Sequence, residues 1–118
     1  MKKAIFLCAL YAITAFHLSA NAAENIMTEK QRRKIVTEEI SLILKQDLKD
    51  PFSAVITFKF ISNYKVCGEI NAKNSFGAYT GNVPFFGWYG TDKKTGRPTS
   101  IGAFTMEGKR YDQTDFCK

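Results

Sequence analysis

The spacing of the apolar residues changes once along this chain, at Asp50-Pro51, and this change limits the folds that the chain can adopt. Before it, apolar residues recur three or four positions apart, which places them on one face of a helix. They are Ile35, Val36, Ile40, Ile43, Leu44 and Leu48. After the proline, β-branched and aromatic residues alternate with polar ones, as is typical of strands. The pattern predicts a helix followed by a sheet.

The ends of the predicted helix are marked by capping residues. Thr28 is a candidate N-cap, and Gln31 stands three positions later, at the spacing of a capping box. The helix must end before Pro51, because a residue that precedes proline is pushed out of the α region. We expect a helix of about twenty residues, with its apolar stripe on the sheet.

The segment after Pro51 predicts four to five strands. They are Val55–Ile61, Val66–Lys73, Val83–Tyr89, Ser100–Met106 and a short fifth over Arg110–Cys117. Polar turns separate them, and the first two should form a hairpin. The expected fold is α+β, with one N-terminal amphipathic helix packed on a twisted antiparallel sheet. An alternating strand cannot bury Phe85, Phe86, Trp88 and Tyr89 on one side, so two should face the helix and the other two should lie on the opposite face or at the rim.

The first residues have the pattern of a secretory signal. Lys2 and Lys3 precede the apolar run Ala4–Phe16, and small residues at Ala20 and Ala22 fit the −3 and −1 positions of a cleavage site. The run of about thirteen residues is shorter than the roughly 20 that a membrane-spanning helix needs. We expect a cleaved leader over 1–22, a single domain over 23–118, and a periplasmic or secreted protein.

Export also decides the chemistry of the cysteines. Cys8 and the single histidine, His17, would leave with the leader, and Cys67 and Cys117 would remain. In an oxidising compartment such a pair predicts a disulfide. Closing a loop of this length stabilises a fold by about 4 kcal/mol in the chain-entropy model. A reactive thiol is disfavoured, because no histidine would be left to activate it.

The composition of the processed chain excludes several classes of function. Without histidine or a free thiol it has no Ser-His-Asp or Cys-His arrangement, and zinc would have only carboxylates as ligands. No glycine-rich phosphate loop or dinucleotide fingerprint is present. We therefore expect no catalytic set, no metal and no cofactor. Loss of Lys2 and Lys3 lowers the formal charge from +6 to +4, a mild excess that favours acidic partners.

A recognition surface is the remaining candidate. Asn71, Lys73 and Asn74 offer amide and ammonium groups, and Tyr79, Trp88 and Tyr89 offer flat apolar faces. Tyrosine and tryptophan dominate binding hot spots and also stack on sugar rings. These six residues are the candidate partner-binding positions.

Two alternatives belong to other classes. A hydrolase acting on peptidoglycan would use two carboxylates, and the available acids are Glu69, Asp92, Glu107, Asp112 and Asp115. A nucleic-acid-binding protein would use basic and aromatic residues together. Against it, the basic residues are divided between the helix start at Lys30–Lys34 and a distant turn at Asp92–Arg97, so we expect them to be scattered.

Two segments carry a resemblance. Asp50-Pro51-x-Ser53-Ala54 and "VCGEINAKNSFGAYTG" over Val66–Gly81 resemble a group of small uncharacterised exported proteins of bacteria and some phages. Phe52 and Ala78 depart from the polar residue and the glycine usual there. The resemblance implies no catalytic or binding role. It supports reading the second segment as a loop with a fixed bend, in which Asn71 and Asn74 hydrogen-bond nearby backbone.

Together these observations favour an exported, non-enzymatic binding protein of the bacterial envelope. Its partner would be an envelope protein or a wall polymer, or a secreted hydrolase for which this chain is an inhibitor or immunity-like partner.

Overall fold

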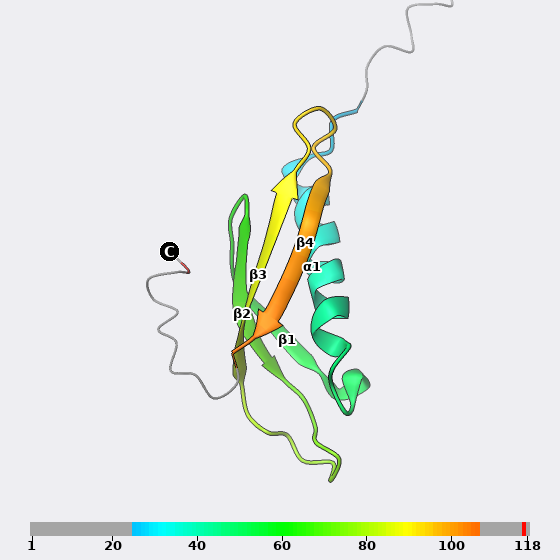
Figure 1. Cartoon of the computed structure of the whole chain (residues 1–118), viewed down its shortest axis with the longest axis vertical. Coiled ribbons are helices and arrows are strands. Elements are labelled where there is room, and N and C mark those ends of the chain that lie inside the picture. Colours follow the sequence, from blue (N-terminus) through cyan, green and yellow to red (C-terminus); the bar gives the residue numbers. More distant parts are fainter. Residues whose placement is uncertain (1–24, 107–116, 118) are drawn as a thin grey trace, which may run out of the picture.

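A computed structural model of the chain describes residues 25–106 and Cys117. The elements are α1 (Glu29–Lys45), a 3-10 helix η1 (Pro51–Ser53), β1 (Val55–Ile61), β2 (Lys65–Asn71), β3 (Val83–Thr91) and β4 (Pro98–Thr105). The strands form one antiparallel sheet in the order β1-β2-β3-β4, so each pairs with its neighbour in sequence (Figure 1). The predicted α+β class and a four-stranded antiparallel sheet are confirmed.

Two predictions fall on parts of the chain that the structure does not describe. The leader over 1–22 is one of them. The other is the fifth strand over Arg110–Cys117, of which only Cys117 is described. Among the described residues, no helix is both long and apolar enough to cross a membrane.

The start of α1 agrees with the capping residues in the sequence. The Gln31 N–H donates to Thr28 Oγ1 at 3.3 Å, and the Thr28 N–H donates to Gln31 Oε1 at 2.9 Å, which completes the predicted capping box. The helix has 17 residues and ends at Lys45, a few residues earlier than predicted. The last turn tightens there, because the Leu48 N–H donates to the Lys45 carbonyl, three residues back.

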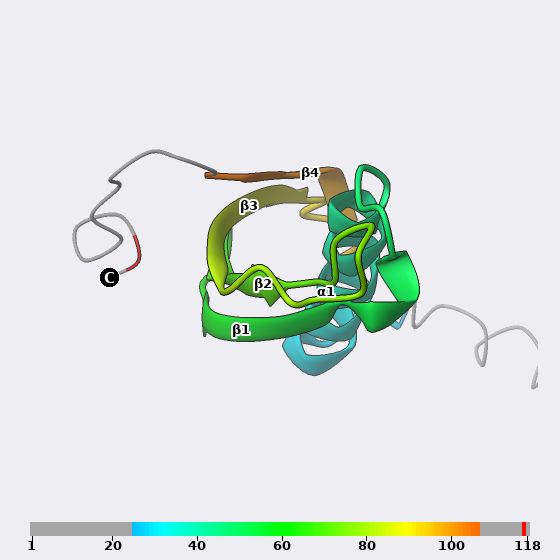
Figure 2. The ribbon, with the colours of Figure 1, turned by 90° about the horizontal axis from the view of Figure 1, so that it is seen from below.

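The main core lies between α1 and the sheet. Val36, Ile40 and Leu44, which repeat every four residues, are buried against one face of the sheet. That face contributes Val66 and Ile70 from β2 and Phe85 and Tyr89 from β3. The sheet curves, and α1 lies on its concave side (Figure 2). Of the four β3 aromatics, Phe85 and Tyr89 face α1, and Phe86 and Trp88 do not, so the predicted division is confirmed.

A smaller cluster lies on the convex face of the sheet, away from α1. Cys67, Phe86 and Met106 are buried in it, and Phe60 packs against them. Cys67 forms a disulfide with Cys117, as predicted, at a sequence separation of 50 residues. The disulfide therefore ties Cys117 to the middle of the sheet.

Candidate functional site

The loop between β2 and β3 has a defined conformation, which its asparagines hold. Asn74 Oδ1 accepts from the N–H groups of Phe76 and Ala78 at 2.9 and 3.2 Å. Asn71 Oδ1 accepts from the Gly81 N–H at 3.2 Å. Gly77 has a positive φ of 77°, which a glycine adopts without strain. The predicted bend is confirmed, and the side-chain oxygens of both asparagines are used inside the loop.

Ser53 joins this loop to η1. Its Oγ donates to the Asp50 carbonyl at 2.8 Å and accepts from the Lys73 N–H at 2.9 Å. Its carbonyl accepts from the Tyr79 hydroxyl at 3.2 Å. The two segments that carry the resemblance are therefore in direct contact, and η1 and the loop form one hydrogen-bonded unit.

This unit lies at the end of the molecule where α1 terminates (Figure 1), and three of its aromatic side chains are exposed. Phe52 in η1 is 100% exposed, Phe76 near the tip of the loop is 94% exposed, and Tyr79 is 50% exposed. The Lys73 ammonium lies 5.5 Å from the centre of the Tyr79 ring, within the range of a cation–π contact. We call Phe52, Lys73, Phe76 and Tyr79 the aromatic end.

Removal of the Ser53 hydroxyl should loosen the loop without unfolding the sheet. The variant Ser53→Ala leaves the Lys73 N–H without its acceptor, which costs about 1–2 kcal/mol. We expect the backbone amides of 73–81 to exchange with solvent about tenfold faster, because local opening becomes easier. Hydrogen exchange followed by mass spectrometry measures this.

Ser41→Ala is the matched control, because the Ser41 hydroxyl donates only within α1, to the Thr37 carbonyl. It should leave exchange in the loop unchanged. Equal exchange in the loop of wild type and Ser53→Ala would show that Ser53 does not hold it.

Trp88 lies on the convex face, apart from the aromatic end. It is 48% exposed, and its ring crosses Gly102 of β4, where an added Cβ would lie 2.2 Å from the indole. The ring of Phe104 lies 5.9 Å from Trp88 and from Phe86, centre to centre. Trp88 is thus accessible to a partner, and its ring packs on Gly102. The structure does not bring Trp88 together with Lys73 and Tyr79.

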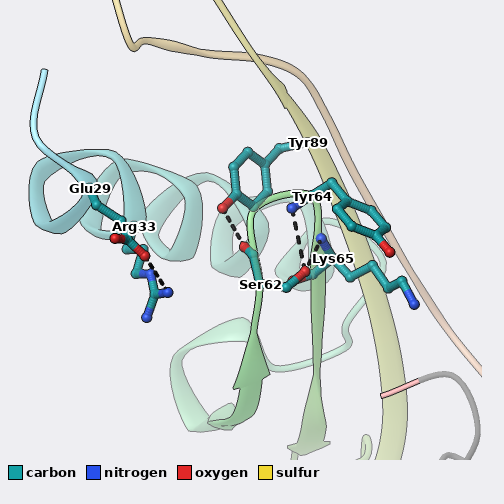
Figure 3. A network of polar contacts seen from close by, with 6 residues as sticks. All are labelled: Glu29, Arg33, Ser62, Tyr64, Lys65 and Tyr89. Atoms are coloured by element: carbon teal, nitrogen blue, oxygen red, sulfur yellow. Dashed lines mark hydrogen bonds and ion pairs between the residues drawn. The ribbon is translucent and has the colours of Figure 1, made fainter. Parts of the chain in front are cut away.

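Tyr89, also a candidate binding position, lies in the core. It is 4% exposed, and its hydroxyl donates to the Ser62 carbonyl in the β1–β2 turn (Figure 3). The same turn is held by Ser62 Oγ, which accepts from the N–H of Lys65 at 3.0 Å. Tyr89 therefore anchors a turn, and we do not include it in the binding surface.

Two of the five candidate acids, Glu69 and Asp92, are among the described residues, and both are engaged in local contacts. Glu69 pairs with the Lys59 ammonium at 2.6 Å. Glu69 pairs with Pro84 near the start of β3, and Asp92 follows the other end of that strand, eight residues later. At about 3.3 Å per strand residue, Asp92 lies roughly 25 Å from Glu69. The backbone N–H groups of Thr95 and Lys94 hydrogen-bond to the Asp92 carboxylate and lower its pKa. Glu107, Asp112 and Asp115 lie outside the described residues.

No three histidine, cysteine, aspartate or glutamate side chains among residues 25–106 and Cys117 lie close enough together to share a metal ion.

The expectation that the basic residues are scattered is wrong. The helix start and the β3–β4 turn lie side by side, as a hydrogen bond between them shows: the Arg32 guanidinium donates to the Gly96 carbonyl at 3.1 Å. The Met27 N–H also donates to the Thr95 carbonyl at 2.8 Å. The sheet is a simple meander, so the β3–β4 turn reaches the end of the molecule at which α1 begins (Figure 1). The sequence analysis did not predict this proximity, because Arg32 and Gly96 are 64 residues apart in the chain.

Phe52 and Phe76 were missed by the sequence analysis. Each stands next to a proline or a glycine in a turn, outside the periodic apolar segments. This position in the sequence is the signal that could have marked both side chains as exposed.

Comparison with known protein families, with curated proteins and with solved structures finds no match to this chain.

Proposed function

We propose that this chain is an exported, non-enzymatic protein that binds another protein of the bacterial envelope through its aromatic end. The observation that carries the proposal is the pair Phe52 and Phe76, nearly fully exposed on a unit that hydrogen bonds hold in one conformation. Exposed phenylalanines grouped at one end of a small domain are typical of interaction sites.

The energetics support a protein partner. Burial of a phenylalanine side chain contributes about 1.5–3 kcal/mol, so two of them supply much of the free energy of a micromolar complex. Because the loop is already ordered by Asn74 and Ser53, little conformational entropy is lost on binding. The ammonium of Lys73 adds a charge beside the aromatic rings, which favours a partner with an acidic group at the border of its apolar site.

A wall polymer or a hydrolase fits the aromatic end less well. Sugar hydroxyl groups are recognised by side chains that both donate and accept hydrogen bonds, and the side-chain oxygens of Asn71 and Asn74 already accept within the loop, which leaves only their NH2 groups for a ligand. Hydrolysis by paired carboxylates needs them within about 5–10 Å of each other. The described candidate acids Glu69 and Asp92 are roughly 25 Å apart, which is too far for this mechanism.

Affinity capture tests the proposal. Tagged wild type and the double variant Phe52→Ser, Phe76→Ser are used to capture proteins from envelope extract, and the retained proteins are quantified. Since both side chains are exposed, the variant should fold normally. We expect at least tenfold less of one discrete partner with the variant, because the buried apolar area is lost.

Leu42→Ser is the control, since Leu42 is an exposed apolar residue on α1. It should retain the partner at the wild-type level. Equal retention by all three proteins, or loss with Leu42→Ser as well, would contradict binding at the aromatic end.

A further inference from the structure

The end of the molecule opposite the aromatic end is rich in cations. Seven basic residues gather where the start of α1 meets the β3–β4 turn: Lys30, Arg32, Arg33, Lys34, Lys93, Lys94 and Arg97. The two contacts from Arg32 and Met27 to this turn hold the segments together. Glu29, Glu38 and Asp92 are the acids of the same segments, so positive charge is in excess.

A groove of about 590 Å³ lies between these segments. Ile26, Met27 and Ile35 give it apolar lining, and Lys34, Lys94 and Arg97 give it basic lining. Ile26 is largely exposed there, so the groove offers apolar surface that the described residues do not cover. Its size and mixed lining fit a short stretch of extended polypeptide.

Two of the cations in the groove are available to a ligand. Arg33 pairs with Glu29, and the Lys34 ammonium lies 4.0 Å from Glu38. Lys94 and Arg97 form no ion pair with any acid in the part of the chain that the structure describes. The carboxylate of Asp92, the nearest acid in sequence, instead accepts from the backbone of the turn.

We propose that this groove binds an extended acidic segment of a partner protein, with a carboxylate opposite Lys94 and Arg97 and an apolar side chain against Ile26 and Ile35. The mixed lining favours a peptide over a phosphate polymer. Glu38 also lines the groove, and a continuous row of phosphates would meet its charge. A peptide places its charges at separate positions and fills the apolar part with side chains that a phosphate backbone lacks.

The site is independent of the proposed function, because it lies at the other end of α1 and uses none of the residues of the aromatic end. The variant Phe52→Ser, Phe76→Ser should therefore bind an acidic peptide as wild type does. A negative result at one site therefore does not contradict binding at the other.

The test measures binding of a fluorescein-labelled decapeptide of alternating Glu and Leu by fluorescence anisotropy. We expect at least tenfold weaker binding when Lys94→Gln is combined with Arg97→Gln, and binding that weakens as salt is raised. Lys45→Gln with Lys49→Gln removes the same charge near the other end of α1 and should leave the affinity unchanged. Ile26→Ser should weaken the Glu-Leu peptide severalfold but not a peptide of alternating Glu and Ser.

Two further probes identify the class of ligand. An oligothymidylate and vesicles containing phosphatidylglycerol carry phosphates without a peptide. Tighter binding of either one than of the Glu-Leu peptide would overturn the proposal, as would equal losses from the two charge-removing pairs. Absence of measurable peptide binding at protein concentrations up to roughly millimolar would overturn it as well.

Discussion

Cys117→Ser lowers the free energy of unfolding by about 4 kcal/mol, because the unfolded chain is no longer closed into a loop by the disulfide. The serine replaces a half-buried residue, and the Cys67 sulfur remains in its cluster with Phe86 and Met106. The change therefore removes the cross-link while leaving the packing around Cys67 in place. Urea denaturation of the purified protein measures the loss.

Reductant provides the control for this variant. Wild type in reductant should unfold at the same urea concentration as Cys117→Ser, and the variant itself should not respond to reductant. Thiol titration of the denatured mature protein, which lacks the predicted leader and with it Cys8, should find no free thiol. If reductant leaves the wild-type transition unchanged, the disulfide does not stabilise the fold as described.

Gly68→Ala lowers the free energy of unfolding by about 3 kcal/mol or more, since the new methyl group has no space. A Cβ at Gly68 would lie 2.0 Å from the backbone oxygen of Thr57 and 2.7 Å from the ring of Phe85. The oxygen belongs to β1, the partner strand, so relief requires β1 and β2 to separate locally. A urea transition at markedly lower concentration is the expected result.

Gly87→Ala is the matched control on the neighbouring strand. Its Cβ would lie 2.6 Å from Cδ1 of Ile40, the terminal atom of a side chain, and 3.3 Å from the Gly102 carbonyl oxygen, so the main clash is with the end of a side chain rather than with backbone. We expect a loss of about 1 kcal/mol there. Equal losses at the two glycines would show that β1 does not approach β2 as closely as the structure has it.

The helix and the strands were predictable because each follows from local chemistry. The cap at Thr28 needs only Gln31 three residues later, and the alternation from Val66 to Ile70 assigns a face to each side chain without reference to other strands. The division of Phe85 and Phe86 between the two faces follows from the same period of two. The end of α1 was misplaced, because the last turn tightens before Pro51. The ends of β2, β3 and β4 also differ from the prediction by one or two residues.

The surfaces were harder to predict because they depend on contacts between segments far apart in sequence. The contact between Ser53 and Lys73 spans 20 residues, and that between Arg32 and Gly96 spans 64. Neither is encoded in a local pattern. Tyr89 shows the converse: its residue type is typical of binding sites, yet it lies on the same face of β3 as Phe85, in the core, where its hydroxyl donates to the Ser62 carbonyl.

Site-specific photo-crosslinking tests the central claim most directly. Benzoyl-phenylalanine is introduced in place of Phe76, and in a separate protein in place of Leu42, and each protein is irradiated in the cells that produce it. Because Phe76 is 94% exposed, the substitution should not disturb the fold. Binding at the aromatic end predicts one discrete protein adduct from position 76 and none from position 42. An adduct from position 42 alone, or no adduct from either position, would contradict it.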